Sequence, residues 1–296
     1  MSDHRCGTIA LVGRPNTGKS SLLNRLVGQK LSIVSPKAQT TRHLVTGILT
    51  TPDCQYVFVD SPGYQTRHAG GLNKSLNRRA SDAARDTNVV CFVVEAPRFG
   101  AADREALARI PEAQVTIAVV NKVDKLAQRD QLLPFVASLS KERAFHAVVP
   151  LSAKSGYNVP ELLKVLREAL PESPPFYAED QLTDRDERFF AAEAVREKLF
   201  LSLGEELPYR CEVAVDSFKE EGRLRRIEAT IWVDSKSQKA IVIGDKGSML
   251  KRIGTAARKD LEAMFDGKVY LGLWVKVREG WSDDERSLRQ FGHSSG

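Results

Sequence analysis

The stretch GRPNTGKS, residues 13–20, decides the fold of the first half of this 296-residue chain. It matches the phosphate-loop pattern GxxxxGK[ST]. It also stands after the apolar run TIALV and before the helix-like run SLLNRLVG, which is the context that the pattern requires. Backbone N–H groups of such a loop close around a β-phosphate, while Lys19 meets β- and γ-phosphate oxygens and Ser20 is a ligand of Mg²⁺. The stretch therefore predicts a nucleotide site in a P-loop NTPase domain.

Short apolar runs alternate with helix-like segments up to about residue 170. The runs are QYVFVD (55–60), NVVCFVVEA (88–96), TIAVVNK (116–122) and HAVVPLS (146–152). Runs that are apolar at nearly every position are typical of parallel strands with helices on both faces. We therefore predict an α/β fold with a doubly wound P-loop NTPase sheet.

Three more motifs follow predicted strands in chain order. In DSPG (60–63), Asp60 can hold a Mg²⁺-bound water and Gly63 can offer its N–H to a γ-phosphate. In NKVD (121–124), Asp124 can accept hydrogen bonds from guanine N1–H and the exocyclic amine, a donor pair that adenine lacks. In LSAK (151–154), the Ala153 amide can meet guanine O6. The predicted GTP contacts are Gly13, Arg14, Pro15, Asn16, Thr17, Gly18, Lys19, Ser20, Ser21, Asp60, Ser61, Pro62, Gly63, Asn121, Lys122, Asp124, Ser152, Ala153 and Lys154.

Tyr64 follows DSPG, at the position where a catalytic Gln is familiar. A phenol cannot orient an attacking water as the amide of Gln does. We therefore expect intrinsic hydrolysis to be slow, with no general base among the side chains of DSPGYQ (60–65), so that the reaction serves as a timer.

The motifs GRPNTGKS, DSPG, NKVD and SAK together resemble the set found in translation-factor-type GTPases, and PKAQTTRH (36–43) resembles switch I of the Era and TrmE group among them. The resemblance implies that Thr41 closes on Mg²⁺ when GTP is bound. From the residues alone, a loop Thr is either a metal ligand or a turn cap. The resemblance also implies that Asn16 helps to bind a potassium ion that replaces an arginine finger. The implied roles are Mg²⁺ ligation by Ser20, Thr41 and Asp60, catalysis by Lys19, Thr41 and Gly63, and a switch I with Gln39, Thr40, Thr41, Arg42 and His43.

The run LPESPPFYAED (170–180) marks a domain boundary, because three prolines within six residues cannot continue a helix. Beyond it the pattern is helix, strand, strand, helix, GxxG loop, helix and strand. The predicted ranges are 5–172 for the GTPase domain, 173–185 for a linker, 186–281 for a smaller α+β domain and 282–296 for a tail.

The run AIVIGDKGSMLKRIG (240–254), in this element order, resembles a type-2 KH domain. In KH domains the GxxG loop joins two helices so that its backbone approaches about four unpaired nucleotides. Residues 181–296 carry 21 basic and 21 acidic residues, but residues 223–259 carry 10 basic and 3 acidic, so the basic surface is local. The Asp245 carboxylate repels phosphate, and Lys246 offsets it. The predicted RNA contacts are Ile243, Gly244, Asp245, Lys246, Gly247, Lys251 and Arg252, with Ile253 also lining the groove for bases.

One phosphate-loop GTPase domain, a Pro-rich linker and one C-terminal KH domain resemble the Era family over essentially the whole chain. The resemblance implies a slow GTPase that uses GTP, GDP and Mg²⁺. It implies binding to the 3′ end of 16S rRNA and a role in assembly of the small (30S) ribosomal subunit and in rRNA maturation. It further implies peripheral association with the inner membrane. We expect a monomer, and no protein partner can be inferred from the sequence.

Composition bears on the partner, the state of the cysteines and the cellular location. The net charge of +6 makes a polyanionic partner plausible but is a weak pointer by itself. Cys6, Cys54, Cys91 and Cys211 lie far apart without a CxxC pair, so we expect mainly buried, reduced thiols. No apolar run approaches the roughly 20 residues of a membrane span, and the start MSDHRCG lacks the apolar region of a secretory signal. We expect a cytoplasmic protein.

Two other functional classes stay open. In one, the chain is an RNA chaperone or passive RNA-binding module whose nucleotide site only stabilises the fold, and measured phosphate release would exclude it. In the other, it is an ATP-dependent RNA enzyme such as a helicase, which NKVD disfavours because that motif is typical of guanine recognition.

Overall fold

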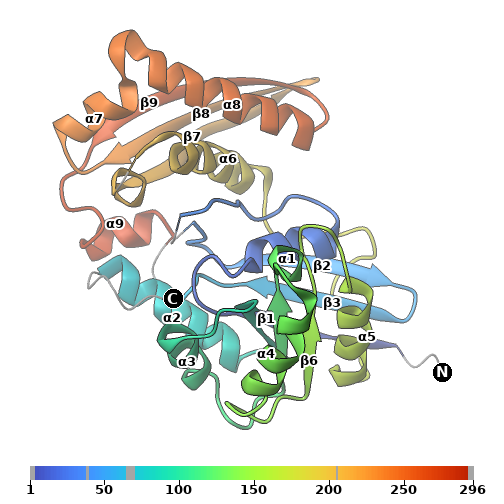
Figure 1. The fold of residues 1–296 in the computed structure, drawn as a ribbon. Helices are drawn as coiled ribbons and strands as arrows, with labels where there is room; N and C mark the ends of the chain where they lie inside the picture. The colour runs from blue at the N-terminus through green and yellow to red at the C-terminus, as the bar shows by residue number, and fades with distance from the viewer. Residues whose placement is uncertain (1–3, 38–39, 65–70, 205, 293–296) are drawn as a thin grey trace. The chain divides into compact units, whose positions relative to one another are not determined.

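The computed structural model describes residues 4–37, 40–64, 71–204 and 206–292, and they form two compact units (Figure 1). The first unit draws its residues from Met1–Ser32, Thr41–Ala69 and Asn73–Asp184. The second draws them from Ile33–Thr40, Gly70–Leu72 and Arg185–Gly296. Two short segments of the N-terminal half therefore belong to the C-terminal unit.

The first unit contains a six-stranded sheet with the order β2-β3-β1-β4-β5-β6. Neighbouring strands are parallel except β2 and β3, which are antiparallel. The predicted doubly wound α/β fold is confirmed, but the sheet is mixed. Strand β2 is not predicted from the sequence, because this edge strand, VTGILTT, lacks the continuous apolar run of a strand covered on both faces. The strands are β1 (Arg5–Val12), β2 (Val45–Thr51), β3 (Cys54–Asp60), β4 (Val89–Glu95), β5 (Thr116–Asn121) and β6 (Ala147–Pro150).

Helices cover both faces of this sheet (Figure 1). On one face, alternate strand residues such as Phe92 and Val120 form a buried core with α2, α3 and α4. On the other face, Gly47 lets α1 approach, because a Cβ there would lie 2.6 Å from Leu23, and the Tyr56 hydroxyl donates to a carbonyl of α5. The helices are α1 (Lys19–Val27), α2 (Gly71–Arg85), α3 (Ala101–Ala108), α4 (Leu132–Leu139) and α5 (Val159–Ala169), with 3₁₀ turns η1 (Val123–Lys125) and η2 (Arg129–Gln131).

The second unit contains a three-stranded sheet with the order β7-β8-β9, in which β8 pairs antiparallel with β7 and parallel with β9. Alternate apolar residues of β8 and β9 form a core with α6 and α8, as the predicted element order requires. The elements are α6 (Glu187–Ser202), η3 (Leu207–Arg210), β7 (Cys211–Glu221), β8 (Leu224–Val233), α7 (Lys236–Ile243), η4 (Asp245–Gly247), α8 (Ser248–Met264) and β9 (Lys268–Val277).

The segment that the sequence analysis assigned to a tail includes a short helix, α9 (Glu285–Gln290). Trp281, just before this helix, is fully buried and donates from Nε1 to the Arg210 carbonyl at 3.1 Å. The ring of Phe291 lies edge-on to Trp281. Phe291 also lies beside the ring of Trp232, so a hydrogen bond and aromatic contacts hold this segment within the second unit.

All four cysteines are buried and free, as expected. Among the described residues, no helix combines the length and the apolar character needed to cross a bilayer.

Candidate functional site

The phosphate loop has a backbone conformation that only its glycines permit. Gly13 has φ 154° and Gly18 has φ 99°. A Cβ on Gly13 would lie 2.3 Å from the Val93 carbonyl oxygen, and one on Gly18 would lie 2.3 Å from Asn121 Nδ2. Positions 13 and 18 therefore favour glycine, both because of the positive φ angle and because a side chain would not fit. The loop leads directly into α1, whose free N–H groups and helix dipole favour an anion.

Lys19 lies across this loop. Its ammonium group donates to the carbonyl oxygens of Gly13 at 3.0 Å and Arg14 at 2.9 Å, and the residue is buried. Burial lowers the pKa of Lys19 to about 8, although the nearby Asp60 carboxylate acts in the opposite direction. A cation held in this way is positioned to meet phosphate oxygens that enter the loop.

Ser20, Thr41 and Asp60 lie together beside the loop. Ser20 Oγ is 2.6 Å from Asp60 Oδ2, to which it donates, and 2.9 Å from Thr41 Oγ1. Asp60 is fully buried, its Oδ1 has no hydrogen-bond partner among the described residues, and burial raises the pKa of its carboxyl group. A buried carboxylate oxygen without a partner, next to two hydroxyls, fits a hard cation with oxygen ligands such as Mg²⁺.

DSPG approaches the phosphate loop closely. A Cβ on Gly63 would lie 2.7 Å from the backbone nitrogen of Pro15, so only glycine fits there. The next residue, Tyr64, donates its N–H to the Gly13 carbonyl at 3.3 Å, while its ring packs in the core and its hydroxyl donates to Ser81 Oγ at 3.1 Å. The side chain at the familiar Gln position therefore turns away from the loop.

Asn121 joins the phosphate loop to the two predicted base loops. Its Nδ2 donates to the Thr17 carbonyl at 2.9 Å, and its Oδ1 accepts from the N–H groups of Lys122 at 2.7 Å and Ala153 at 3.0 Å. Asp124 is exposed, and its Oδ1 accepts a 2.5 Å hydrogen bond from Ser152 Oγ. The structure therefore brings NKVD and SAK together, with the Asp124 carboxylate oriented by Ser152.

Arg25 of α1 is a residue that the sequence analysis missed. It donates from Nε to the Ala153 carbonyl at 3.0 Å and from Nη2 to the Lys154 carbonyl at 2.5 Å. It holds the SAK loop through backbone carbonyls. No sequence motif marks it, because its partners lie 128 and 129 residues away.

The GxxG loop of the second unit also depends on glycine. Gly244 and Gly247 have φ 73° and 81°, and a Cβ on Gly244 would lie 2.7 Å from Met249 Cβ. A Cβ on Gly247 would meet nothing within 4 Å. The first glycine therefore permits the tight turn, and the second leaves open space at the surface.

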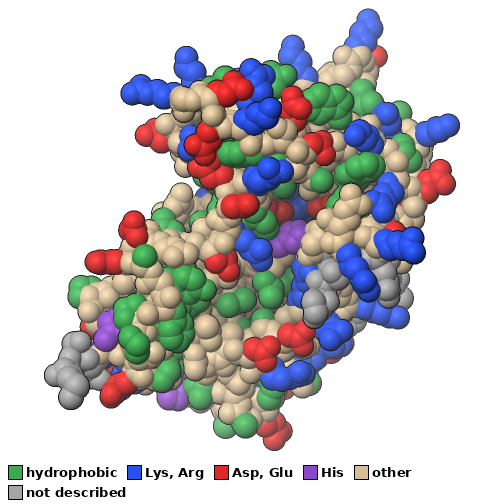
Figure 2. Space-filling model, turned by 180° about the vertical axis from the view of Figure 1, so that it is seen from behind, with side chains coloured by type: hydrophobic (Ala, Val, Ile, Leu, Met, Phe, Trp, Pro, Cys, Tyr) green, Lys and Arg blue, Asp and Glu red, His purple; other side chains and the backbone are tan. Residues whose placement is uncertain are grey.

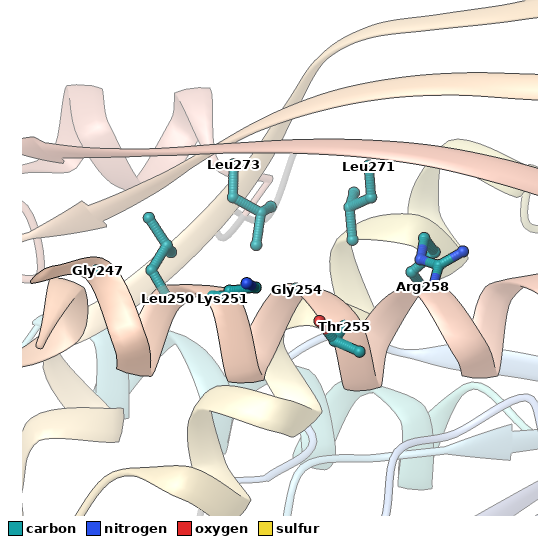
Figure 3. Close-up of a pocket in the computed structure, with 8 residues that line it drawn as sticks. All are labelled: Gly247, Leu250, Lys251, Gly254, Thr255, Arg258, Leu271 and Leu273. Atoms are coloured by element: carbon teal, nitrogen blue, oxygen red, sulfur yellow. The ribbon is translucent and has the colours of Figure 1, made fainter.

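A groove of about 350 Å³ runs between α8 and β9, beginning at Gly247 (Figure 3). Its floor is apolar, and basic side chains border it. Gly254 lets the strand approach α8, since a Cβ there would lie 3.3 Å from Leu273 Cδ1. The lining residues are Gly247, Leu250, Lys251, Gly254, Thr255, Arg258, Leu271 and Leu273.

Comparison with known proteins identifies both units. Residues 8–122 match the family described as 50S ribosome-binding GTPase, and residues 206–282 match the KH domain family. GTPase Era of Chromobacterium violaceum is 53% identical over 287 residues, which cover 97% of each chain. GTPase Era of Neisseria meningitidis is 53% identical over 291 residues, which cover 98% of this chain and 95% of that one. The chain belongs to the Era GTPase family.

Two solved Era structures resemble the whole chain, each at 36% identity and a TM-score of 0.95. One is an Aquifex aeolicus Era variant bound to GDP and AlF4⁻, which matches 98% of this chain and 100% of its own. The other is Era in complex with MgGDPNP and nucleotides 1506–1542 of 16S ribosomal RNA, which matches 99% and 100%. The chain is therefore an Era-type GTPase with a C-terminal KH domain.

In this Era-family chain, the predicted switch I is divided between the two units, and Gln39 lies outside the described residues. Thr41 belongs to the first unit. Thr40 belongs to the second, where its carbonyl accepts from Arg196 of α6 at 2.5 Å, and the Val34 N–H donates to Glu197 Oε1 at 3.1 Å. Of the other predicted switch residues, Arg42 is fully buried and His43 is partly buried.

The KH groove contains only some of the residues predicted to contact RNA. Arg252 does not line it, because this side chain donates to the Ser202 carbonyl of α6 at 3.3 Å. Ile253 is fully buried in the core, and Ile243 packs against that core instead of lining the groove. Lys251 and Gly247 do line it.

The β9 side of the groove and Arg258 are not among the RNA contacts predicted from the sequence. The signal was present in the helical period, since residues 251, 254 and 258 share one face of α8 and Gly247 directly precedes the helix. Figure 2 shows many Lys and Arg side chains on the second unit, interspersed with Asp and Glu, in line with its balanced overall charge.

Proposed function

We propose that this Era-family GTPase is a slow molecular switch. In this proposal it binds single-stranded 16S rRNA near its 3′ end through the KH groove, and it assists 30S subunit assembly and rRNA maturation. The observation that carries the proposal is the match, over 99% of the chain, to an Era solved with MgGDPNP and that part of 16S rRNA. The groove itself supports it, because an apolar floor beside Lys251 and Arg258 suits unpaired bases and their phosphates.

For the reaction, we assign Lys19 to the β- and γ-phosphate oxygens and the Gly63 N–H to the γ-phosphate. Ser20, Thr41 and Asp60 would hold Mg²⁺, which neutralises phosphate charge when bound. Tyr64 points into the core, so it leaves the attacking water without a side chain that orients it. Slow hydrolysis follows from that orientation.

A potassium ion is the second cation we propose, on the basis of Asn16. This residue has φ 63°, an uncommon conformation for a non-glycine residue, at the turn of the phosphate loop. An added cation would supply the charge of an absent arginine finger, which is worth about 10³-fold or more in other GTPases. We expect phosphate release to be faster in potassium than in sodium at matched ionic strength. Equal rates in the two salts would remove the role of potassium.

The divided switch I supports coupling between GTP and RNA. Thr40 is held by Arg196 in the second unit, and its neighbour Thr41 lies against Ser20 in the first. Ordering of Thr41 by bound GTP would therefore act on a segment that α6 also holds. By linkage, RNA binding and GTP binding must change each other's affinity by the same factor.

Lys251→Ala is expected to weaken binding of a 16S rRNA 3′-end oligonucleotide by about tenfold, the worth of one charge-assisted hydrogen bond. It should also make the salt dependence of log affinity less steep by about 1. Arg252→Ala is the matched control, because it removes the same charge from the same helix but from a side chain bonded to Ser202. We expect the control to bind normally.

The measurement is electrophoretic mobility shift of the full chain with and without a non-hydrolysable GTP analogue, followed by crosslinking in cells and sequencing of the attached RNA. Equal losses in the two variants would show that charge alone, and not the groove, binds RNA. Affinity that does not respond to the GTP analogue would contradict the coupling. Crosslinks that avoid the 16S rRNA 3′ end would contradict the assembly role.

We propose the cytoplasm as the location, with peripheral contact at the inner membrane supported by the family resemblance alone. A monomer binding the small ribosomal subunit is the assembly we propose.

A further inference from the structure

Two carboxylates beside the phosphate loop have no part in the mechanism above. Glu95 ends β4, and Asp103 lies in the first turn of α3, where it is only 3% exposed. Asp103 accepts from Arg14 Nε with both oxygens, at 3.0 and 3.2 Å. Glu95 Oε2 lies 3.4 Å from Arg14 Nη2 and 3.0 Å from Lys122 Nζ. Arg14 belongs to the phosphate loop and Lys122 to NKVD.

The two cations that these carboxylates hold, Arg14 and Lys122, also donate hydrogen bonds to the backbone of the phosphate loop. Lys122 Nζ donates to the Asn16 carbonyl at 2.5 Å, and Arg14 Nη1 donates to the Pro15 carbonyl at 3.4 Å. Glu95 therefore connects NKVD to the turn of the phosphate loop through one carboxylate oxygen. Such a connection is charge-assisted at both ends, which makes its hydrogen bonds stronger than neutral ones.

The backbone at both ends of this connection is unfavourable by itself. Asn16 has φ 63° and Lys122 has φ 64°, left-handed conformations that non-glycine residues adopt rarely. Such residues persist where their surroundings hold them. Burial alone would raise the pKa of Glu95, but its contacts with Lys122 and Arg14 outweigh burial and lower it. The carboxylate therefore stays charged and can hold both cations.

Asp103 strengthens the same arrangement from another element. Its Oδ2 also accepts the Gly100 N–H at 3.0 Å and so caps α3. Burial raises the pKa of Asp103, and Arg14 opposes that shift. Both Asp103 oxygens share the Arg14 Nε–H, while Nη2 of the same guanidinium meets Glu95 and Nη1 meets the Pro15 carbonyl, so contacts on three nitrogens hold the Arg14 side chain in one orientation.

We propose that Glu95 and Asp103 are positioning residues of the GTP site, and that Glu95 couples guanine recognition to phosphate binding. The inference rests on the proposed assignment of the GTP contacts, because Asp124 follows Lys122 in the same loop. When Glu95 holds Lys122, the base loop and the phosphate loop keep one fixed spacing. Without it, each loop binds its part of the nucleotide in a less defined position.

Glu95→Gln in the full chain tests this, since it keeps the shape and removes the charge. Release of mant-GDP measures the rate of GDP dissociation. The ratio of GTP to ITP affinities measures base recognition, because ITP lacks the 2-amino group from which Asp124 would accept a hydrogen bond. We expect GDP dissociation to accelerate about tenfold, the worth of one charge-assisted hydrogen bond. We also expect the preference for GTP over ITP to fall.

The matched control is Glu142→Gln, which breaks the 2.6 Å ion pair with Arg104 of α3, next to Asp103, but touches no nucleotide loop. It should leave both values unchanged. Asp103→Asn is the second variant, and it should accelerate GDP dissociation even if Glu95→Gln fails to fold. A cycle that combines Glu95→Gln with Lys122→Gln should be non-additive, because both changes break one contact.

The inference is overturned if Glu95→Gln releases GDP at the unaltered rate. It is also overturned if the variant loses GTP and ITP affinity by the same factor, since that result indicates a role in the phosphate loop alone. Failure of the unaltered chain to bind mant-GDP would instead contradict the assignment of the GTP site.

Discussion

Lys19→Ala is expected to abolish measurable GTP hydrolysis. The ammonium group is buried in the phosphate loop, where it donates to the carbonyl oxygens of Gly13 and Arg14. A buried charge aimed at transferring phosphate is worth far more than one in water, and we expect a loss of about 10³-fold or more in kcat/KM. Phosphate release in magnesium and potassium buffer measures it.

The control for this change is Lys141→Ala, which removes an exposed lysine beyond α4. Thermal unfolding should show that Lys19→Ala remains folded, because the change takes an ammonium group out of a site where burial disfavours its charge. If Lys19→Ala releases phosphate at a rate within about threefold of that of the unaltered chain, the catalytic role of Lys19 is contradicted.

Asp124→Asn is expected to change the base that the site prefers. The carboxylate is exposed and oriented by the Ser152 hydroxyl, so the change leaves the fold intact and alters only what the group offers to a base. Guanine presents two donors to a carboxylate, whereas xanthine presents a donor and an acceptor, which match the amide of Asn. We expect GTP affinity to fall about 100-fold and XTP to become the better ligand.

Competition of GTP, XTP and ATP against mant-GDP measures this preference. Asp130→Asn, which changes an exposed carboxylate of η2, should leave the order of affinities unchanged. If ATP competes with GTP equally in the unaltered chain, the assignment of NKVD to guanine is wrong, and the ATP-dependent class gains support.

The nucleotide loops could be predicted because each is a contiguous motif at a strand end. Such a motif specifies both the functional side chains and their place in the fold. Glu95 and Asp103 could not, since they act on Arg14 from 81 and 89 residues away and belong to no motif. Edge strand β2 could not be predicted either, because its sequence, VTGILTT, lacks a continuous apolar run. Fold class therefore follows from local pattern, whereas the contacts that steady the loops need the tertiary structure.

The KH groove likewise has one side that could be predicted from local sequence and one side that needs the tertiary structure. Its α8 side follows from the run after GxxG, but its β9 side depends on a parallel pairing with β8 that no local pattern specifies. The sequence predicts Arg252, like Lys251, as a phosphate contact, because both basic residues follow the GxxG loop. A single residue turns an α-helix by about 100°, so neighbours on α8 face different surroundings, and Arg252 bonds to Ser202.

The membership of Ile33–Thr40 in the second unit affects how the chain can be dissected. The polypeptide passes between the units several times, so no single cut yields either one with all of its own residues. Truncation after Asp184 would delete Arg196 and Glu197, the residues to which Thr40 and Val34 are bonded. An excised N-terminal fragment would thus contain a switch I segment without the residues that hold it. Its rate of GTP hydrolysis would therefore differ from that of the intact chain.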